Sequence, residues 1–407
     1  RDSRALRGQI TFGRTLGGGW RLQATPFARS IDADLLLHFF PSRALEESAQ
    51  RGGGVLTALY YDPNPDLSIA AGFDVDATRA TLRETQARAT QPAGYVSGLH
   101  YDYAVDARVL ALYAQANWAF SPGWRIVAGA RGERATFDYD NRAPTGDVGR
   151  FRRAADRKDR FETLTPKLGL IREFEQGSAW LNFASGARAP QAADLYSLQT
   201  LQRPGEQKAE TIDSAELGVR TTIGKARLEA ALYAMEKDNA AFRNADGFTV
   251  PFARTRHRGV ELGAEVETTA RLSLAGWISY AQHTYAFSDP STRAGESIRN
   301  GDDVDSAPRW LWNARALWKP HERVSGELEW IHMGRYFTNA ANTRAYPGHD
   351  VFNVRVRTTL SPHVDLAVAV RNIADEAYAE RADFAFGVDR YFPGEPRTLS
   401  VSLALKR

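Results

Sequence analysis

The chain has 407 residues, with 52 Lys and Arg against 49 Asp and Glu, so its formal net charge is +3. It contains no Cys, which excludes a disulfide framework, a thiol nucleophile and a thiolate metal site. So small a positive excess, evenly spread, also argues against a nucleic-acid-binding protein. No apolar run reaches the roughly 18 residues that a transmembrane helix needs, which leaves membrane-spanning strands open.

The dominant pattern is alternation of apolar and polar residues, which places successive side chains on opposite faces of a strand. Between Val109 and Phe120, for example, Leu110, Leu112 and Trp118 take even positions, whereas Gln115 takes an odd one. No stretch has a comparably long helical period, so we expect no major helix. Marking each alternating segment predicts seventeen strands, near residues 5–16, 20–37, 53–62, 66–82, 107–120, 124–140, 160–174, 178–188, 208–222, 225–239, 249–268, 272–286, 304–319, 324–338, 348–361, 364–378 and 390–405.

The connections between these strands alternate in length. Short turns lie at 16–20, 62–66, 120–124, 174–178, 222–226, 319–323 and 361–364. Long polar connections lie at about 38–53, 83–107, 140–160, 188–208, 239–249, 286–304, 338–348 and 378–390. Short turns at one end and long loops at the other are typical of an outer-membrane β-barrel.

Large aromatic residues cluster beside the short turns. They are Trp20, Tyr60, Tyr61, Phe120, Trp124, Phe174 and Trp318. A soluble antiparallel sandwich would alternate in the same way, but an aromatic girdle at one end indicates a membrane interface. We therefore expect Trp20 and Trp124 at the same end of the sheet, and Leu112 and Leu403 facing lipid.

Charges of both signs occupy the polar positions of the strands. Examples are Arg227, Glu229, Arg315, Glu327 and Arg355. An Arg or Lys facing lipid at the bilayer midplane would cost about 2 to 4 kcal/mol. The polar face is therefore expected to line a wet or filled lumen.

The strand count suggests that strands precede Arg1, because bacterial single-chain barrels use even numbers. The first connection is a short turn, so the first strand runs toward the short-turn end and should be an even-numbered strand of the barrel. Seventeen strands that end at the twenty-second would begin at the sixth, which is even-numbered. A barrel of about 22 strands holds a plugged lumen. The chain also lacks an initiator Met and a signal peptide, so we expect a mature or excised piece.

Five segments resemble those of TonB-dependent receptors of the outer membrane. The segments are AWLNFASGARAPQAADLY at 179–196, KAETIDSAELGVR at 208–220, TRHRGVELGAEVE at 255–267, DSAPRWLWNARALW at 305–318 and VRNIADEAYAE at 370–380, followed by Pro393-Gly394. Ala187 stands where the family usually has Phe, Ile373 where it often has Leu, and the chain ends in Lys406-Arg407 without a terminal aromatic residue. The resemblance implies part of a transmembrane antiparallel barrel in the outer membrane of a Gram-negative bacterium, with the plug domain, the energy-coupling box and the first strands outside residues 1–407.

The function implied by this resemblance is import of a scarce, large nutrient, most often a ferric siderophore. Its partners would be the nutrient, outer-membrane lipid and lipopolysaccharide, and the energy-transducing protein TonB through the N-terminal region; we expect a monomer without a cofactor. Cobalamin, a sugar oligomer or another metal chelate remain open as substrates. The competing hypotheses are a passive porin and a soluble all-β scaffold.

Ligand capture is expected in the long loops and the adjoining strand ends, where aromatic faces and Arg donors suit anionic, oxygen-rich chelates. The candidate residues are Phe39, Phe40, Tyr101, Tyr196, Arg203, Tyr285, Phe337, Tyr346 and Tyr391, with His100, Tyr103, Phe287, Tyr336 and Phe392 as further members. Each could instead pack a loop or join an aromatic girdle. The basic loop at 140–160 could concentrate anionic ligands, bind lipopolysaccharide phosphates or be solvated.

Other chemistry is not supported. The eight His residues show no ligand spacing along the chain, so we expect surface or girdle positions and no metal site. No His lies between Pro190 and Lys208, which argues against a haem receptor by the same resemblance. The sequence contains no nucleophile elbow and no phosphate-binding loop, and we predict that the protein is not an enzyme.

Overall fold

The computed structural model describes residues 2–37, 43–90, 94–200, 202–244, 249–291, 293, 295–385 and 387–405. The fold is all-β, and its main sheet contains 18 strand segments in the described part of the chain. β1 (Asp2–Gln9) and β2 (Phe12–Gly17) both pair with β3 (Trp20–Leu36), so they form one interrupted edge strand. Counted in this way, the sheet has the seventeen strands that the alternation predicts.

The chain divides into two compact units. Unit 1 comprises Arg1–Leu170, Phe183–Asp213 and Lys237–Ala253, and unit 2 comprises Ile171–Asn182, Ser214–Glu236 and Arg254–Arg407. Five strands cross the boundary between the units. They are β10 (Arg157–Phe174), β11 (Gly177–Arg188), β13 (Glu210–Ile223), β14 (Ala226–Arg243) and β15 (Thr249–Thr269).

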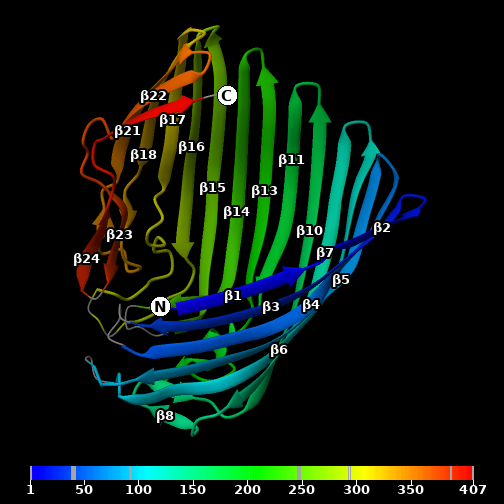
Figure 1. Cartoon of the computed structure of the whole chain (residues 1–407), viewed down its shortest axis with the longest axis vertical. Helices are drawn as coiled ribbons and strands as arrows, with labels where there is room; N and C mark the ends of the chain where they lie inside the picture. The colour runs from blue at the N-terminus through cyan, green and yellow to red at the C-terminus, as the bar shows by residue number, and fades with distance from the viewer. Residues whose placement is uncertain are drawn as a thin grey trace. The chain divides into compact units, whose positions relative to one another are not determined.

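In unit 1, successive strands pair in antiparallel order. After β3 the strands are β4 (Leu45–Asn64), β5 (Leu67–Gln86), β6 (Gly98–Ser121) and β7 (Trp124–Asn141). They lie side by side in Figure 1, and each is hydrogen-bonded to the next. β7 in turn pairs with β10.

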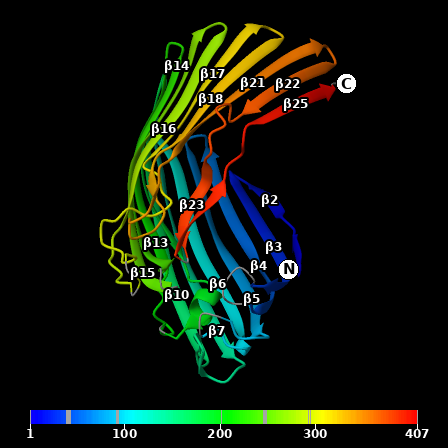
Figure 2. The ribbon, with the colours of Figure 1, turned by 90° about the vertical axis from the view of Figure 1, so that its left-hand side faces the viewer.

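In unit 2, the same simple up-and-down order continues. After β15 the strands are β16 (Leu272–Tyr285), β17 (Trp310–His321), β18 (Val324–Met333), β21 (His349–Ser361), β22 (Val364–Arg371) and β25 (Thr398–Leu405). Figure 2 shows β17, β18, β21, β22 and β25 as neighbours, in agreement with the register in which they pair. Four of these strands are several residues shorter than predicted: β17 begins at Trp310, β18 ends at Met333, β22 ends at Arg371 and β25 begins at Thr398.

The aromatic residues beside the short turns of unit 1 lie at one end of the sheet. Trp20 pairs with Tyr61 across β3 and β4, and their rings stack with centroids 4.3 Å apart. In β6 and β7, Ser121 pairs with Trp124 at the same turn end, where Leu67 pairs with Trp118. The prediction that Trp20 and Trp124 share one end is therefore confirmed.

The turn between β2 and β3 requires glycine. Gly19 has a φ of 85°, and a Cβ there would lie 2.5 Å from the carbonyl oxygen of Asp62. The close approach aligns the turn with the end of β4, because the Asp62 N–H donates to the Gly19 carbonyl. Only a residue without a side chain fits this backbone conformation and this contact.

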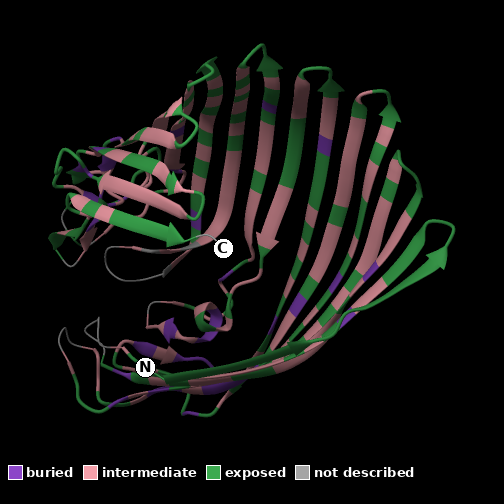
Figure 3. Cartoon of the chain, turned by 45° about the horizontal axis from the view of Figure 1, so that its top comes forward, coloured by how far each residue is buried: buried purple, intermediate pink, exposed green. Residues whose placement is uncertain are grey.

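Large apolar side chains are exposed along one face of the sheet. In β6 the side chains of Leu110 and Leu112 are 48% and 64% exposed, whereas Ala111, which points the other way, is buried. In β25 Leu399, Val401 and Leu403 are all more than 60% exposed. Figure 3 shows this alternation as bands along the strands. A soluble protein buries such residues, so the pattern is the one expected of strands whose outer face meets lipid.

Ion pairs cross the polar face, between paired strands (β18 and β21) or over an intervening strand (β7 to β5 over β6, and β3 to β5 over β4). Arg131 binds Asp74 at 2.6 Å and Arg29 binds Asp76 at 2.9 Å in unit 1. In unit 2, Arg355 lies 3.3 Å from Glu327. Opposite charges placed side by side in this way confine the polar side chains to one face and leave the other face to apolar residues.

The long connections contain small elements that the sequence pattern does not predict. They include the helix α1 (Ala192–Tyr196) and the three-stranded sheet of β8 (Gly146–Val148), β9 (Phe151–Arg153) and β12 (Leu198–Gln199). Two hairpins follow in unit 2. They are β19 (Tyr336–Phe337) with β20 (Ala345–Tyr346), and β23 (Ala379–Ala385) with β24 (Val388–Pro393). None of the helices in the described residues has the length and apolar character needed to cross a membrane.

Candidate ligand-binding site

The long loops of unit 1 fold onto a buried aromatic cluster. Tyr101, Tyr103, Tyr139, Phe151 and Tyr196 pack together with Val105, Ala154 and Leu195. Tyr196 is fully buried and stacks on Tyr139 with centroids 4.2 Å apart. We name this set of residues the loop core.

Hydrogen bonds tie the tyrosines of the loop core to the loop backbone and to one carboxylate. The Tyr101 hydroxyl donates to the Leu198 carbonyl at 2.5 Å, and the Tyr196 hydroxyl donates to Asp159 at 3.0 Å. Burial and the neighbouring Asp159 carboxylate raise the pKa of Tyr196, so its hydroxyl stays protonated. Tyr101 and Tyr196 were predicted as ligand-binding residues, and the structure places both inside the loop core.

The basic loop at 140–160 is largely neutralised by its neighbours. Arg152 binds Asp147 at 2.8 Å and Lys158 binds Asp138 at 2.9 Å. Arg153 is buried and donates to the His100 carbonyl at 2.9 Å. The hydrogen bond from Arg152 lowers the pKa of Asp147, so this pair remains charged at neutral pH. These pairings favour an internal structural role over an electrostatic attraction of anions.

The remaining predicted residues lie in several different surroundings. Arg203 is exposed in the connection after β12. Tyr285 is buried at the end of β16, where its hydroxyl donates to Asp305 at 2.5 Å. Phe39 and Phe40 lie outside the described residues. Phe337, Tyr346 and Tyr391, by contrast, come together in the hairpins of unit 2.

Those two hairpins form one packed layer. The Tyr336 hydroxyl accepts a hydrogen bond from the Ala382 N–H at 2.8 Å, and the Tyr346 hydroxyl accepts one from the Ala379 N–H at 3.1 Å. Both tyrosines are 5% exposed, and Met333 packs against them. The buried tyrosines thus hold the β19–β20 hairpin against the β23–β24 hairpin.

Arginine and aromatic side chains cover this layer. The Arg335 guanidinium lies 4.7 Å from the ring centre of Phe337, Arg344 lies 5.0 Å from Phe384, and Arg381 lies 4.9 Å from Phe392. Tyr391 is 58% exposed beside them, with its ring 6.5 Å from that of Tyr346. We call Arg335, Phe337, Arg344, Phe384, Arg381, Tyr391 and Phe392 the Arg–aromatic surface. Its Arg members were not predicted from the sequence, because two of the three pairs join residues that become neighbours only in the fold.

A carboxylate fixes part of this surface. Asp383 accepts hydrogen bonds from Arg390 at 2.6 Å and from Arg381. Burial raises the pKa of Asp383, but these two hydrogen bonds outweigh that effect and leave the pKa below its usual value. At neutral pH the carboxylate is therefore ionised and holds Arg381 in place over Phe392.

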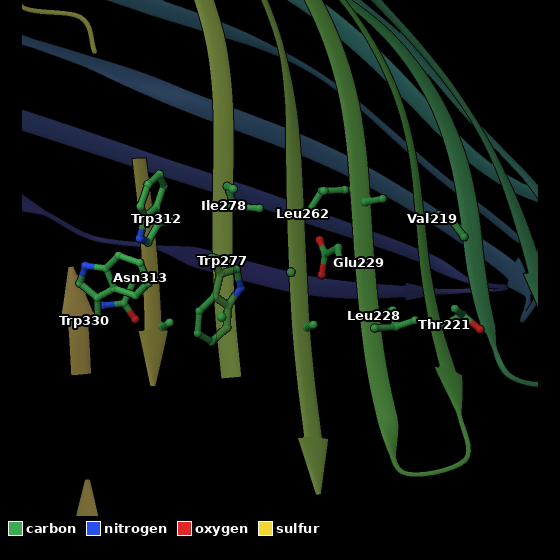
Figure 4. A pocket seen from close by; sticks show the side chains of 15 residues that line it. Val219, Thr221, Leu228, Glu229, Leu262, Trp277, Ile278, Trp312, Asn313 and Trp330 are labelled. Carbon is green, nitrogen blue, oxygen red and sulfur yellow. The ribbon is translucent and has the colours of Figure 1, made fainter. Parts of the chain in front are cut away.

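A hollow of about 750 Å³ lies on the apolar face of the sheet in unit 2. Leu262 pairs with Ile278, which pairs with Trp312, so all three share that face and line the hollow (Figure 4). Its lining is almost wholly apolar, so it does not suit a charged chelate. Among the described residues, no three His, Asp or Glu side chains gather into a metal site.

The comparisons agree with the sequence pattern and the fold. Residues 1–373 match the family model described as TonB dependent receptor-like, beta-barrel. The metal-pseudopaline receptor CntO of Pseudomonas aeruginosa strain PAO1 is 26% identical over 314 residues, which are 74% of this chain and 41% of that protein. The chain thus spans less than half the length of this curated relative.

Solved structures share the fold at low sequence identity. The siderophore receptor PiuA from Acinetobacter baumannii has a TM-score of 0.70 at 16% identity, covering 99% of this chain and 64% of that one. The ferric citrate transporter FecA in its unliganded form has a TM-score of 0.76 at 16% identity, covering 99% and 61%. These neighbours are receptors and transporters, not enzymes. Taken with the family match over most of its length, they show that the chain belongs to the TonB-dependent receptors, a family of outer-membrane β-barrel proteins.

Proposed function

We propose that the protein containing this chain imports a ferric siderophore across the outer membrane of a Gram-negative bacterium, with energy supplied through TonB. In the whole protein these strands would belong to a barrel of about 22 strands around a plug. The proposal is supported by the family and by relatives whose names refer to siderophores and metal chelates. The exposed apolar face supports contact with outer-membrane lipid and lipopolysaccharide, and we expect a monomer.

The Arg–aromatic surface is the observation that carries the choice of ligand class. Ferric siderophores present anionic oxygens, and many also present aromatic rings. Guanidinium groups donate to anionic oxygens, while aromatic side chains offer flat apolar faces to rings. Arg335, Arg344 and Arg381 provide the first kind of contact, and Phe337, Tyr391 and Phe392 provide the second. Arg203 in unit 1 is a further exposed donor of the same kind.

The first test measures uptake in cells. A strain lacking the full-length gene should grow poorly under iron limitation on at least one ferric siderophore, and the intact gene should restore growth. Growth and uptake should also fail when TonB is deleted or the proton-motive force is collapsed. Uptake that persists without TonB would favour the passive porin, and unchanged uptake of every ferric chelate would refute the iron assignment.

A second test addresses the surface directly. Replacing Arg335, Arg344 or Arg381 by Ala removes a charge-assisted contact worth about 1.5 to 3 kcal/mol, so siderophore affinity should fall on the order of tenfold or more. Arg397→Ala is a matched control, because Arg397 is equally exposed but pairs with Asp375 outside the Arg–aromatic surface. Equal effects of the control and the three variants would exclude this surface as the binding site.

A further inference from the structure

Two histidines face each other on neighbouring strands of unit 2. His257 of β15 is paired in register with His283 of β16. Their Nδ1 atoms are 2.8 Å apart, and the ring centres are 5.0 Å apart with the planes inclined by 55°. Two imidazole nitrogens at this separation share one proton, since one must donate and the other accept. When each neutral ring instead carries its proton on Nε2, both Nδ1 lone pairs are directed at the same small volume.

The pair lies on the polar face of the sheet. In β15, His257 is an even number of residues from Glu261 and Glu265, so these three side chains point to the same face. Leu262 and Val266 point to the apolar face. Two residue pairs nearer the turn, on the same face, Gly259 lies opposite Ala281, so β15 and β16 place no large side chain there, and the ring of Tyr233 from β14 lies over Gly259. Both histidines are half-buried, so they remain partly accessible.

A methionine stands beside the pair on the third strand. The Glu267 N–H donates to the Lys225 carbonyl, Arg256 binds Glu236 at 3.4 Å, and the α-carbon of Gly259 faces the ring of Tyr233. In this register Met235 of β14 is opposite His257 and on the same face. The chain has only two Met residues, so a thioether in this position is unusual. The other, Met333, packs against the tyrosines of the β19–β20 hairpin.

The hydroxyl of Thr255 is hydrogen-bonded to the second ring nitrogen of His257. The Thr255 Oγ1 lies 2.9 Å from the Nε2 of His257. When Nε2 carries the proton and donates to Thr255, the Nδ1 of His257 keeps its lone pair. Metal-binding histidines commonly have such a partner on their second nitrogen, because it sets the tautomer and the ring orientation.

We propose that His257, His283 and Met235 bind one copper(I) ion. Two imidazole nitrogens and a thioether sulfur form a soft donor set, which favours copper(I), whereas carboxylate-rich sets favour harder ions. A zinc site would call for a fourth ligand of the His, Cys, Asp or Glu type; the described residues offer no such cluster. The site requires no siderophore and goes beyond the proposed import function.

The test is a copper(I) titration of the full-length protein in detergent, under reducing conditions and against a colorimetric copper(I) chelator. We expect one bound ion in the wild type. His257→Ala and His283→Gln should each weaken binding on the order of tenfold or more. Met235→Leu, which conserves volume, should also weaken copper(I) binding. His332→Ala is the control, because His332 lies on the opposite face and pairs with Asp350 at 2.8 Å.

X-ray absorption at the copper edge of the wild type provides a readout that does not depend on how the variants fold. A sulfur atom and two imidazoles in the first shell are expected, and the sulfur contribution should vanish in Met235→Leu. Wild-type affinity in correctly folded His257→Ala and His283→Gln proteins would overturn the proposal. So would a copper shell without sulfur in the wild type. Because siderophore uptake is measured separately, loss of that activity would leave this result unaffected.

Discussion

Individual side chains report which face of the sheet meets the membrane. Leu112 is 64% exposed in β6 and Leu403 is 62% exposed in β25. If both contact lipid, Leu112→Arg or Leu403→Arg near the midplane should cost about 2 to 4 kcal/mol. We expect a marked loss of folded protein in the outer membrane, measured as the heat-modifiable band on a gel.

The control for this prediction is Arg315→Ala on the polar face. Arg315 lies 5.1 Å from the ring centre of Trp277. Losing that cation–π contact should cost only about 0.5 to 1 kcal/mol, so the folded fraction should remain near that of the wild type. If Arg315→Ala reduced assembly as much as the two Arg substitutions, our assignment of the faces would be incorrect.

Tyr196 tests whether a buried loop tyrosine supports the loops or binds a ligand. Its ring is fully buried against Tyr139, so Tyr196→Ala should cost about 3 to 5 kcal/mol locally, as for other large aromatic side chains. Faster cleavage of the 140–160 and 190–207 connections by protease is expected. Tyr391→Ala, at an exposed position, should leave the cleavage rate unchanged but weaken siderophore binding. The reverse result would make Tyr196 a ligand contact.

At the scale of elements, the hairpin β23–β24 should depend on pH through Asp383. The pKa of this carboxylate is lower in the folded hairpin than in an unfolded chain, where it is about 3.9. The ionised form therefore stabilises the hairpin fully above that value, and the stabilisation is lost as the pH falls through the folded pKa. Hydrogen exchange of the hairpin amides should accelerate over this acidic range beyond the ordinary pH dependence of exchange. Asp383→Asn should remove the additional acceleration, and an unchanged profile in that variant would contradict the role of Asp383.

The strands could be predicted from the sequence because alternation is a local property. Each strand of the main sheet corresponds to one alternating segment, although β4 and β6 begin 8 and 9 residues earlier than predicted, at Leu45 and Gly98. The residues added at the start of β6 include His100, Tyr101 and Tyr103, all buried. Their polar and aromatic character resembles that of a loop, but Tyr101 and Tyr103 pair with β5, and their rings pack against Phe151 and Tyr196.

The candidate site was less predictable because it depends on contacts between distant segments. Phe337, Tyr346 and Tyr391 were identified from their loop positions, but their arrangement was not. Arg381 reaches Phe392 only because β23 and β24 pair. The proximity of His257 and His283 could not be predicted for the same reason: they are 26 residues apart and become neighbours only through strand register.

At the scale of the whole molecule, one property separates a membrane-spanning sheet from a soluble one. Large apolar side chains are exposed on many strands, from Leu6 in β1 to Leu405 in β25. The largest apolar patch on a typical soluble monomer is only about 300 to 600 Å². Large apolar side chains exposed on so many strands exceed what is typical of a soluble monomer, so we expect the protein to need an amphiphile to stay dispersed.

We therefore predict that the purified protein remains monodisperse in detergent and aggregates when the detergent is removed. Size-exclusion chromatography with light scattering measures both states. Transfer into lipid nanodiscs should restore a single species, because acyl chains then cover the residues around Leu112 and Leu403. A variant with Asp at three exposed positions of β25, namely Leu399, Val401 and Leu403, should lose incorporation into nanodiscs. A protein that stayed monodisperse without amphiphile would have to bury this apolar face in some other way, and the outer-membrane assignment would fail with it.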